Sequence, residues 1–158
     1  MNYLHNFKFY FLSVKEIIYK TPDSKNYLIL LNSDLSKRES IAFKVRTCHD
    51  AHIALINGYT EKDQRFEFII MGKNKRQKPL ENMYMDIYLN CSRFKSFVIN
   101  WNLPSLSTNK GSKIKVGIHD DSNIWIGPSN LNSVKAIGFY TGPGTTGEWM
   151  FNTEGKYI

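Results

Sequence analysis

Short runs in which apolar and polar residues alternate occupy most of this chain. In the clearest of them, Ile41, Phe43 and Val45 alternate with small or polar residues. Side chains of a β-strand point alternately to its two faces, so each run predicts a strand with one apolar face and one wet face. Similar strand-like runs occupy residues 27–31, 51–55, 66–70, 85–89, 97–101, 114–118, 123–126, 134–140 and 148–151.

Turn-forming residues separate these runs at short intervals, as Asn57-Gly58 does between two of them. Many short strands joined by such turns predict an all-β fold, namely a two-sheet antiparallel β-sandwich of jelly-roll-like form. Residues 14–19 form a helix-like stretch, but Ile17 and Ile18 within it are also good strand residues. A doubly wound nucleotide fold is not expected, because that fold needs helices between its strands.

The chain of 158 residues is long enough for one domain with its own hydrophobic core. We expect a strand-like N-terminal extension, residues 1–19, that packs on a domain formed by residues 20–158. No apolar run approaches the roughly 18–20 residues of a membrane-spanning helix. Lys8 and Lys15 interrupt the apolar N-terminal run and no small-residue cleavage site follows. There is therefore no clear export signal, which favours a cytoplasmic over a secreted protein.

Basic residues outnumber acidic ones by 21 to 14, which gives a formal net charge of +7. This balance favours an acidic partner, here an acidic small molecule, a glycan or a protein. The densest basic run lies at residues 73–78 and has no stacking aromatic residue beside it. Nucleic acid is therefore an unfavoured partner. The sequence leaves the oligomeric state open.

A glycine-rich stretch, residues 141–149, has the four-residue gap of a phosphate-binding loop between Gly142 and Gly147. The chemistry of such a loop requires a lysine and a hydroxyl next, and Glu148 and Trp149 stand there instead. The stretch therefore predicts a tight hairpin in which glycines supply positive φ, with a ligand-binding loop as the alternative.

The segment Cys48-His49-Asp50-Ala51-His52 carries residue types used in metal and acid–base chemistry. On a strand, Asp50 and His52 share a face, which predicts either a hydrogen-bonded pair or a ligand-contacting pair. Tetrahedral zinc needs three or four ligands and nucleophilic catalysis needs an oriented base. Because neither set is complete, no metal site and no catalytic residue is expected. Cys48 and Cys91 could form one disulfide or remain two buried thiols.

Four motifs together resemble the farnesoic acid O-methyltransferase domain family of arthropods and other animals. They are Phe-Lys-Val-Arg at residues 43–46, Asp-Ala-His-Ile-Ala-Leu at 50–55, Phe-Lys-Ser-Phe-Val-Ile-Asn-Trp at 94–101 and Ile-Gly-Phe-Tyr-Thr-Gly-Pro-Gly-Thr-Thr-Gly-Glu-Trp at 137–149. They follow the family's order and span most of the chain. Two tryptophans of the family pattern are missing, one near Gly72 and one where Pro143 stands.

The resemblance implies methyl transfer from S-adenosylmethionine to farnesoic acid, and also a domain reused as a module in larger proteins. The residues themselves show neither the glycine turn before a helix nor the acidic ribose partner of a doubly wound cofactor site. We therefore expect a non-catalytic binding module that needs no cofactor. The alternative is an S-adenosylmethionine-dependent methyltransferase. The residues expected to bind the ligand are Asp50, His52, Asn74, Gly142, Gly144 and Trp149.

Overall fold

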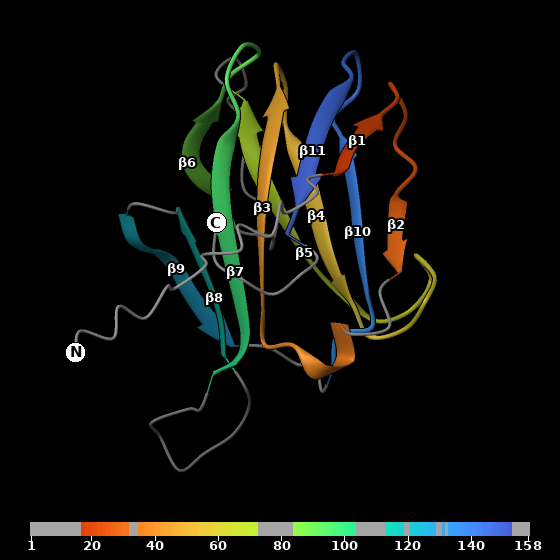
Figure 1. The fold of residues 1–158 in the computed structure, drawn as a ribbon, viewed down its shortest axis with the longest axis vertical. Coiled ribbons are helices and arrows are strands. Elements are labelled where there is room, and N and C mark those ends of the chain that lie inside the picture. Colours follow the sequence, from red (N-terminus) through yellow and green to blue (C-terminus); the bar gives the residue numbers. More distant parts are fainter. Residues whose placement is uncertain are drawn as a thin grey trace, which may run out of the picture.

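The structure is a computed structural model, and it describes residues 17–31, 35–72, 84–103, 113–118, 121–128, 131 and 133–152. Eleven strands in two sheets make up most of this part of the chain (Figure 1). The strands are β1 (Ile17–Thr21), β2 (Leu28–Leu31), β3 (Ser40–Thr47), β4 (Ala51–Ile56), β5 (Arg65–Gly72), β6 (Tyr84–Leu89), β7 (Lys95–Leu103), β8 (Lys113–Ile118), β9 (Asp121–Pro128), β10 (Ala136–Thr141) and β11 (Gly147–Phe151). One short 3₁₀ helix, Leu35–Lys37, precedes β3.

The two sheets confirm the predicted all-β sandwich. The six-stranded sheet has the order β1-β11-β3-β7-β8-β9, and the five-stranded sheet has the order β2-β10-β4-β5-β6. Without β6, β8 and β9, the orders β1-β11-β3-β7 and β2-β10-β4-β5 are those of a jelly roll, with two four-stranded sheets. Consecutive strands alternate between the sheets from β1 to β4, so the chain repeatedly crosses the core.

One strand pair departs from the antiparallel expectation. Within the described strands β6 runs parallel to β5, with a shift of register between Ile70 and Gly72, and the other pairs are antiparallel. A two-residue hairpin makes neighbouring strands antiparallel, whereas a longer connection allows the parallel direction. Alternation of apolar and polar residues does not encode strand direction. A parallel strand and an antiparallel strand therefore show the same sequence pattern.

The core lies between the sheets and is formed by the apolar residues of the alternating runs. On β3, Ile41, Phe43 and Val45 are buried, whereas the residues between them are partly exposed. Phe43 stands opposite Phe97 on β7 and Phe151 on β11, and these rings pack together. Burial of each such side chain stabilises the fold by about 1.5–3 kcal/mol, so these strands hold the sheets together.

The predicted wet face is missing on β4. Its residues Ala54 and Ile56 point away from the main core, yet they are fully buried. They form a second apolar cluster with Ala136, on which Tyr27 and Ile29 pack. The strand lies in the middle of its sheet, and the segment around β2 covers its outer face. The prediction from alternation holds only where water lies on the outer face of the sheet. At this position the outer face of β4 is covered by protein.

The N-terminal part of the described chain forms a strand. The helix-like stretch at residues 14–19 overlaps β1, which pairs with β11 from Ile17 to Thr21. The boundary expected between residues 19 and 20 therefore falls inside β1. Residues 1–16 lie outside the described residues, as does the basic run at 73–78.

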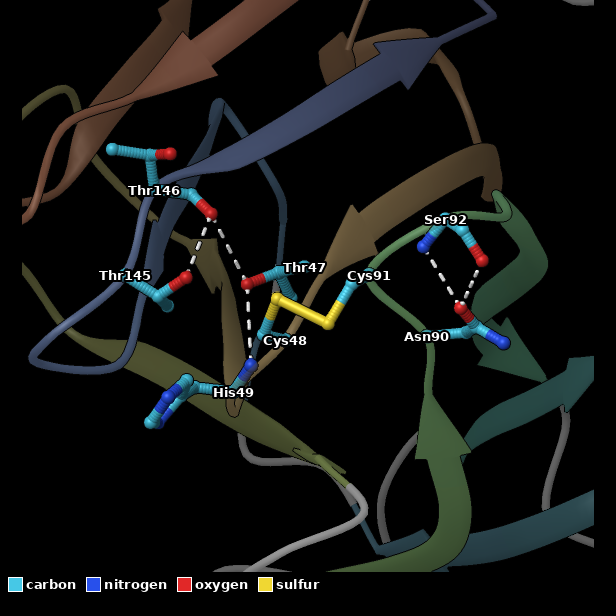
Figure 2. The surroundings of a disulfide bond; sticks show 8 residues. All are labelled: Thr47, Cys48, His49, Asn90, Cys91, Ser92, Thr145 and Thr146. Carbon is cyan, nitrogen blue, oxygen red and sulfur yellow. Dashed lines mark hydrogen bonds between the residues drawn. A yellow bond between two sulfur atoms is a disulfide. The ribbon is translucent and has the colours of Figure 1, made fainter.

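A disulfide joins Cys48 and Cys91, whose Cα atoms are 4.4 Å apart (Figure 2). Of the two alternatives left open by the sequence, the structure therefore has the disulfide. Cys48 lies in the crossover from β3 to β4, and Cys91 lies in the crossover from β6 to β7. The bond thus links two connections between the sheets, at the same end of the sandwich.

Candidate functional site

Three residues expected to bind a ligand lie at the end of the sandwich and make hydrogen bonds within the protein. The amide of Gly142 donates to the backbone oxygen of Asp50 at 2.6 Å. The amide of Gly144 donates to Oδ1 of Asp23 at 2.7 Å. Gly144 has a φ of +88°, which an L side chain rarely adopts, so this loop is a tight turn that requires glycine. The prediction of a hairpin is wrong, however, because β10 and β11 belong to different sheets and the turn carries the chain from one sheet to the other. The role of the stretch in ligand binding stays a prediction.

Trp149, also expected at the ligand site, is wholly buried between the sheets. Its indole Nε1 donates to the Thr21 hydroxyl at 3.3 Å, and that hydroxyl also lies 3.1 Å from the Thr141 hydroxyl. Gly147 leaves room for these two threonines, because an added Cβ would collide with the side chain of Thr141. Trp149 thus serves core packing. Asn74 lies outside the described residues.

His52 lies on a different surface, the outer face of the five-stranded sheet. Its Nδ1 donates to Oε1 of Glu67 at 3.0 Å, because an ionised carboxylate only accepts. Its ring stacks on that of Tyr140, with centroids 4.1 Å apart and planes 13° apart. The partner of His52 is therefore Glu67 and not Asp50. Asp50 precedes the first residue of β4, so the strand alternation that predicted a shared face does not extend to it.

The strand register explains why these three side chains meet. Tyr140 on β10 stands directly opposite His52 on β4, and Glu67 on β5 stands opposite Ala54. Residues two apart on neighbouring strands share a face and lie within reach of long side chains. Glu67 is thus the diagonal neighbour of His52. The three residues form a row across β10, β4 and β5, which lie side by side in Figure 1.

A groove of about 610 Å³ opens beside this row. Its volume lies within the range of roughly 300–1,000 Å³ that is typical of small-molecule sites. Eight residues line it: Lys25, Asn26, Tyr27, Glu61, Lys62, Arg65, Glu67 and Tyr140. They come from the segment before β2, the β4–β5 loop, and strands β5 and β10. Five of the eight carry charge, three as cations and two as carboxylates.

Tyr27 forms one wall of this groove because the strand below it carries a glycine. A Cβ at Gly138 would lie 2.8 Å from Cδ1 of Tyr27 and 3.1 Å from Cδ1 of Ile56, so a side chain there would displace the ring. The ring of Tyr27 meets that of Tyr140 edge to face, with centroids 4.8 Å apart. The guanidinium of Arg65 lies 5.5 Å from the centre of the Tyr27 ring. The wall is thus held by aromatic and cation–π contacts.

The ionisable groups of the groove affect one another. Burial raises the pKa of the Glu67 carboxyl, but the His52 hydrogen bond, the nearby Tyr27 hydroxyl and the Arg65 charge outweigh burial and bring the pKa below its usual value. Burial, reinforced by Glu67, raises the pKa of Tyr140 to about 12 and that of Tyr27 further. The Tyr27 hydroxyl is buried beside Glu67 and lacks a hydrogen bond of normal geometry. Both tyrosines are therefore neutral at physiological pH, and Glu67 is ionised.

Glu67→Gln should lower the free energy of unfolding by about 1–2 kcal/mol at neutral pH, because a charge-assisted hydrogen bond in an open groove is lost. The folded-state pKa of Glu67 lies below the unfolded value near 4.5. Its stabilising effect is therefore present above that value and declines as the pH falls below it. Urea unfolding of both proteins between pH 3 and 7 measures the difference.

Glu61→Gln, which removes a carboxylate from the exposed β4–β5 loop, serves as the matched control. An unfolding difference between wild type and Glu67→Gln that stays constant across this pH range would contradict the linkage.

The β4–β5 loop that carries Glu61 and Lys62 is fixed by internal hydrogen bonds. Oδ2 of Asp63 accepts from the amides of Tyr59 and Thr60 and from the Thr60 hydroxyl, each at 2.9 Å. These bonds, with those from Thr60 strongest, lower the pKa of Asp63. Gly58 must be glycine, because a Cβ there would overlap the Asp63 side chain. The loop is therefore preformed although it is exposed.

The alternating pattern predicted His52 correctly on a strand but did not point to the groove residues around it. Glu67 lies in the strand-like run at residues 66–70, where it alternates with apolar residues, and this was the available signal. A hairpin at Asn57-Gly58 would have made β4 and β5 neighbours and so brought Glu67 toward His52. Lys25 and Tyr27 gave no such signal, since they reach the groove only through the pairing of β2 with β10.

Within the described ranges, no cluster of three or more His, Cys, Asp or Glu residues could hold a metal ion. In the same part of the chain, no helix has the length and apolar character needed to cross a membrane. No protein-family model matches this chain, and neither a curated protein nor a solved structure matches it.

Proposed function

We propose that this protein is a non-catalytic binding module, and that its ligand site is the groove on the outer face of the five-stranded sheet. The observation that carries the proposal is the lining of this groove, in which Lys25, Lys62 and Arg65 surround a polar hollow of small-molecule size. Three cations against two carboxylates favour a ligand that carries negative charge. This agrees with the acidic ligand expected from the overall charge.

The same lining bears on the methyltransferase alternative implied by the family resemblance. Farnesoic acid is mostly an apolar isoprenoid chain, and burying it requires an apolar cavity. A groove whose residues are mainly charged suits a polar ligand better. We therefore propose recognition of a polar anion in place of methyl transfer. The family membership stays a prediction.

The disulfide supports a proposal about the protein's environment. Disulfides persist in oxidising compartments and are rare in the cytosol, where thiols are kept reduced. The bond between Cys48 and Cys91 closes a separation of 43 residues and lies at an exposed end of the sandwich. We propose that the protein acts in an oxidising environment, in place of the cytoplasmic location favoured by the sequence.

The Lys25→Ala/Lys62→Ala double variant should bind a small anion about five- to tenfold more weakly than wild type. Each exposed cation contributes about 0.5–0.7 kcal/mol to such an interaction, and 1.4 kcal/mol corresponds to a factor of ten. Titration of ¹⁵N-labelled protein with glucuronate and with citrate, followed by amide shifts, measures the affinity. Shifts should centre on Asn26, Tyr27 and Lys62.

Lys20→Ala is the matched control, because it removes the same charge from β1 in the other sheet. It should leave the affinity unchanged. The proposal would be wrong if the anions shifted no groove amide, or if the control weakened binding as much as the double variant. Calorimetric binding of S-adenosylmethionine would instead favour the methyltransferase.

A further inference from the structure

We infer that the groove recognises a sugar acid, that is, a saccharide that carries a carboxylate. This inference rests on the proposed function and names the ligand class of the same site. It follows from what the groove offers besides positive charge: a carboxylate, an amide and two tyrosine rings, on a sheet face whose backbone groups are already paired.

The balance of charges limits how acidic the ligand can be. Glu67 is engaged by His52, and Arg65 lies over Tyr27 and donates through Nη1 to the backbone oxygen of Glu61. The remaining charged groups of the lining are the ammonium groups of Lys25 and Lys62 and the carboxylate of Glu61. The excess is about one positive charge. One carboxylate at the rim balances it, whereas a densely sulfated or phosphorylated ligand would face repulsion from Glu61.

The hydrogen-bonding groups of the lining other than the cations indicate hydroxyl groups on the ligand. A carboxylate such as Glu61 only accepts hydrogen bonds, and the side-chain amide of Asn26 both donates and accepts. A ligand made of acceptors alone would leave Glu61 without a donor. Sugar hydroxyls both donate and accept hydrogen bonds. The C–H groups of a sugar ring suit contact with aromatic rings such as those of Tyr27 and Tyr140, whose planes stand at 87° to each other.

The position of the groove argues against an acidic peptide. Extended peptides gain much of their affinity by adding a strand to an open sheet edge. The groove instead lies over β10, β4 and β5, each of which has a partner strand on both sides. Recognition here must therefore use side chains. The rim loop is preformed by the three bonds to Asp63, which reduces the entropy lost on binding.

The test compares tetrameric probes in the ¹⁵N titration. The hyaluronan tetrasaccharide carries carboxylates, and fully N-acetylated chitotetraose is its neutral counterpart. Heparin tetrasaccharide is densely sulfated, and tetraglutamate is an acidic peptide. The hyaluronan probe should bind the groove at least tenfold more tightly than chitotetraose and tetraglutamate. It should also bind more tightly than the heparin probe.

Glu61→Ala separates recognition of hydroxyls from attraction of charge. If Glu61 accepts from sugar hydroxyls, Glu61→Ala weakens binding of the hyaluronan probe about three- to tenfold. If only charge matters, removing a negative group strengthens binding, and this would overturn the inference. Glu39→Ala removes an equal charge from the residue before β3, which is not part of the groove lining, and should change little.

The two proposals fail in different ways. If glucuronate and citrate shift groove amides but tetraglutamate or chitotetraose binds as well as the hyaluronan probe, the ligand class is wrong and the binding groove stands. If no probe shifts a groove amide, the proposed function itself is wrong.

Discussion

Replacing Trp149 with alanine is expected to lower the free energy of unfolding by about 3–5 kcal/mol. The side chain has no exposed surface, and its ring packs against those of Phe43, Phe139 and Phe151. Its loss would leave a cavity in the centre of the core and remove the indole donor from Thr21. Urea denaturation followed by far-ultraviolet circular dichroism measures the effect.

Two variants act as controls for this result. Trp149→Phe retains a buried ring and should cost less, while Tyr59→Ala removes an exposed ring, of which 62% is accessible, and should cost little. A Trp149→Ala protein with near wild-type stability but weakened ligand binding would contradict core packing. It would restore the ligand-contact role that the sequence suggested for this residue.

Removing the disulfide with the Cys48→Ser/Cys91→Ser double variant should lower the free energy of unfolding by about 2–4 kcal/mol. The bond closes a separation of 43 residues, so its loss frees a large loop in the unfolded chain. Both cysteines are exposed, which means that the serines add no buried polar group. Urea unfolding with and without dithiothreitol measures the effect.

The reductant provides the control for this prediction. Dithiothreitol should destabilise the wild type to about the level of the double variant and should leave the variant unchanged. An identical unfolding midpoint for the oxidised and reduced wild type would contradict a stabilising disulfide. The groove lies on another surface, so binding of glucuronate by the folded double variant should persist.

Most strands could be predicted because alternation is a local property of the chain. The residues Ile41, Phe43 and Val45 were expected on one face and are buried together. The prediction of a wet face was wrong on β4, where Ala54 and Ile56 are covered by Tyr27 and Ile29. That cover comes from a segment distant in sequence, and no local pattern reports it.

The candidate site was less accessible to sequence analysis. His52 was singled out for its neighbour Asp50, yet the structure pairs it with Glu67, fifteen residues further along the chain. Trp149 was singled out for a motif, yet it lies in the core. For both residues the residue type indicated a structural or functional role. The residues that each side chain contacts depended on which strands are neighbours and on their register. A shift by one residue would move each side chain to the opposite face.

The sequence by itself determined the all-β character and most of the side chains that form the core between the sheets, because side-chain direction in a strand follows from position along the chain. Tertiary structure alone decided the parallel pairing of β6, the bond between Cys48 and Cys91, and the groove around Glu67 and Arg65. These features join residues that are far apart in the chain. Their formation depends on the packing of whole sheets, which no short stretch of residues encodes.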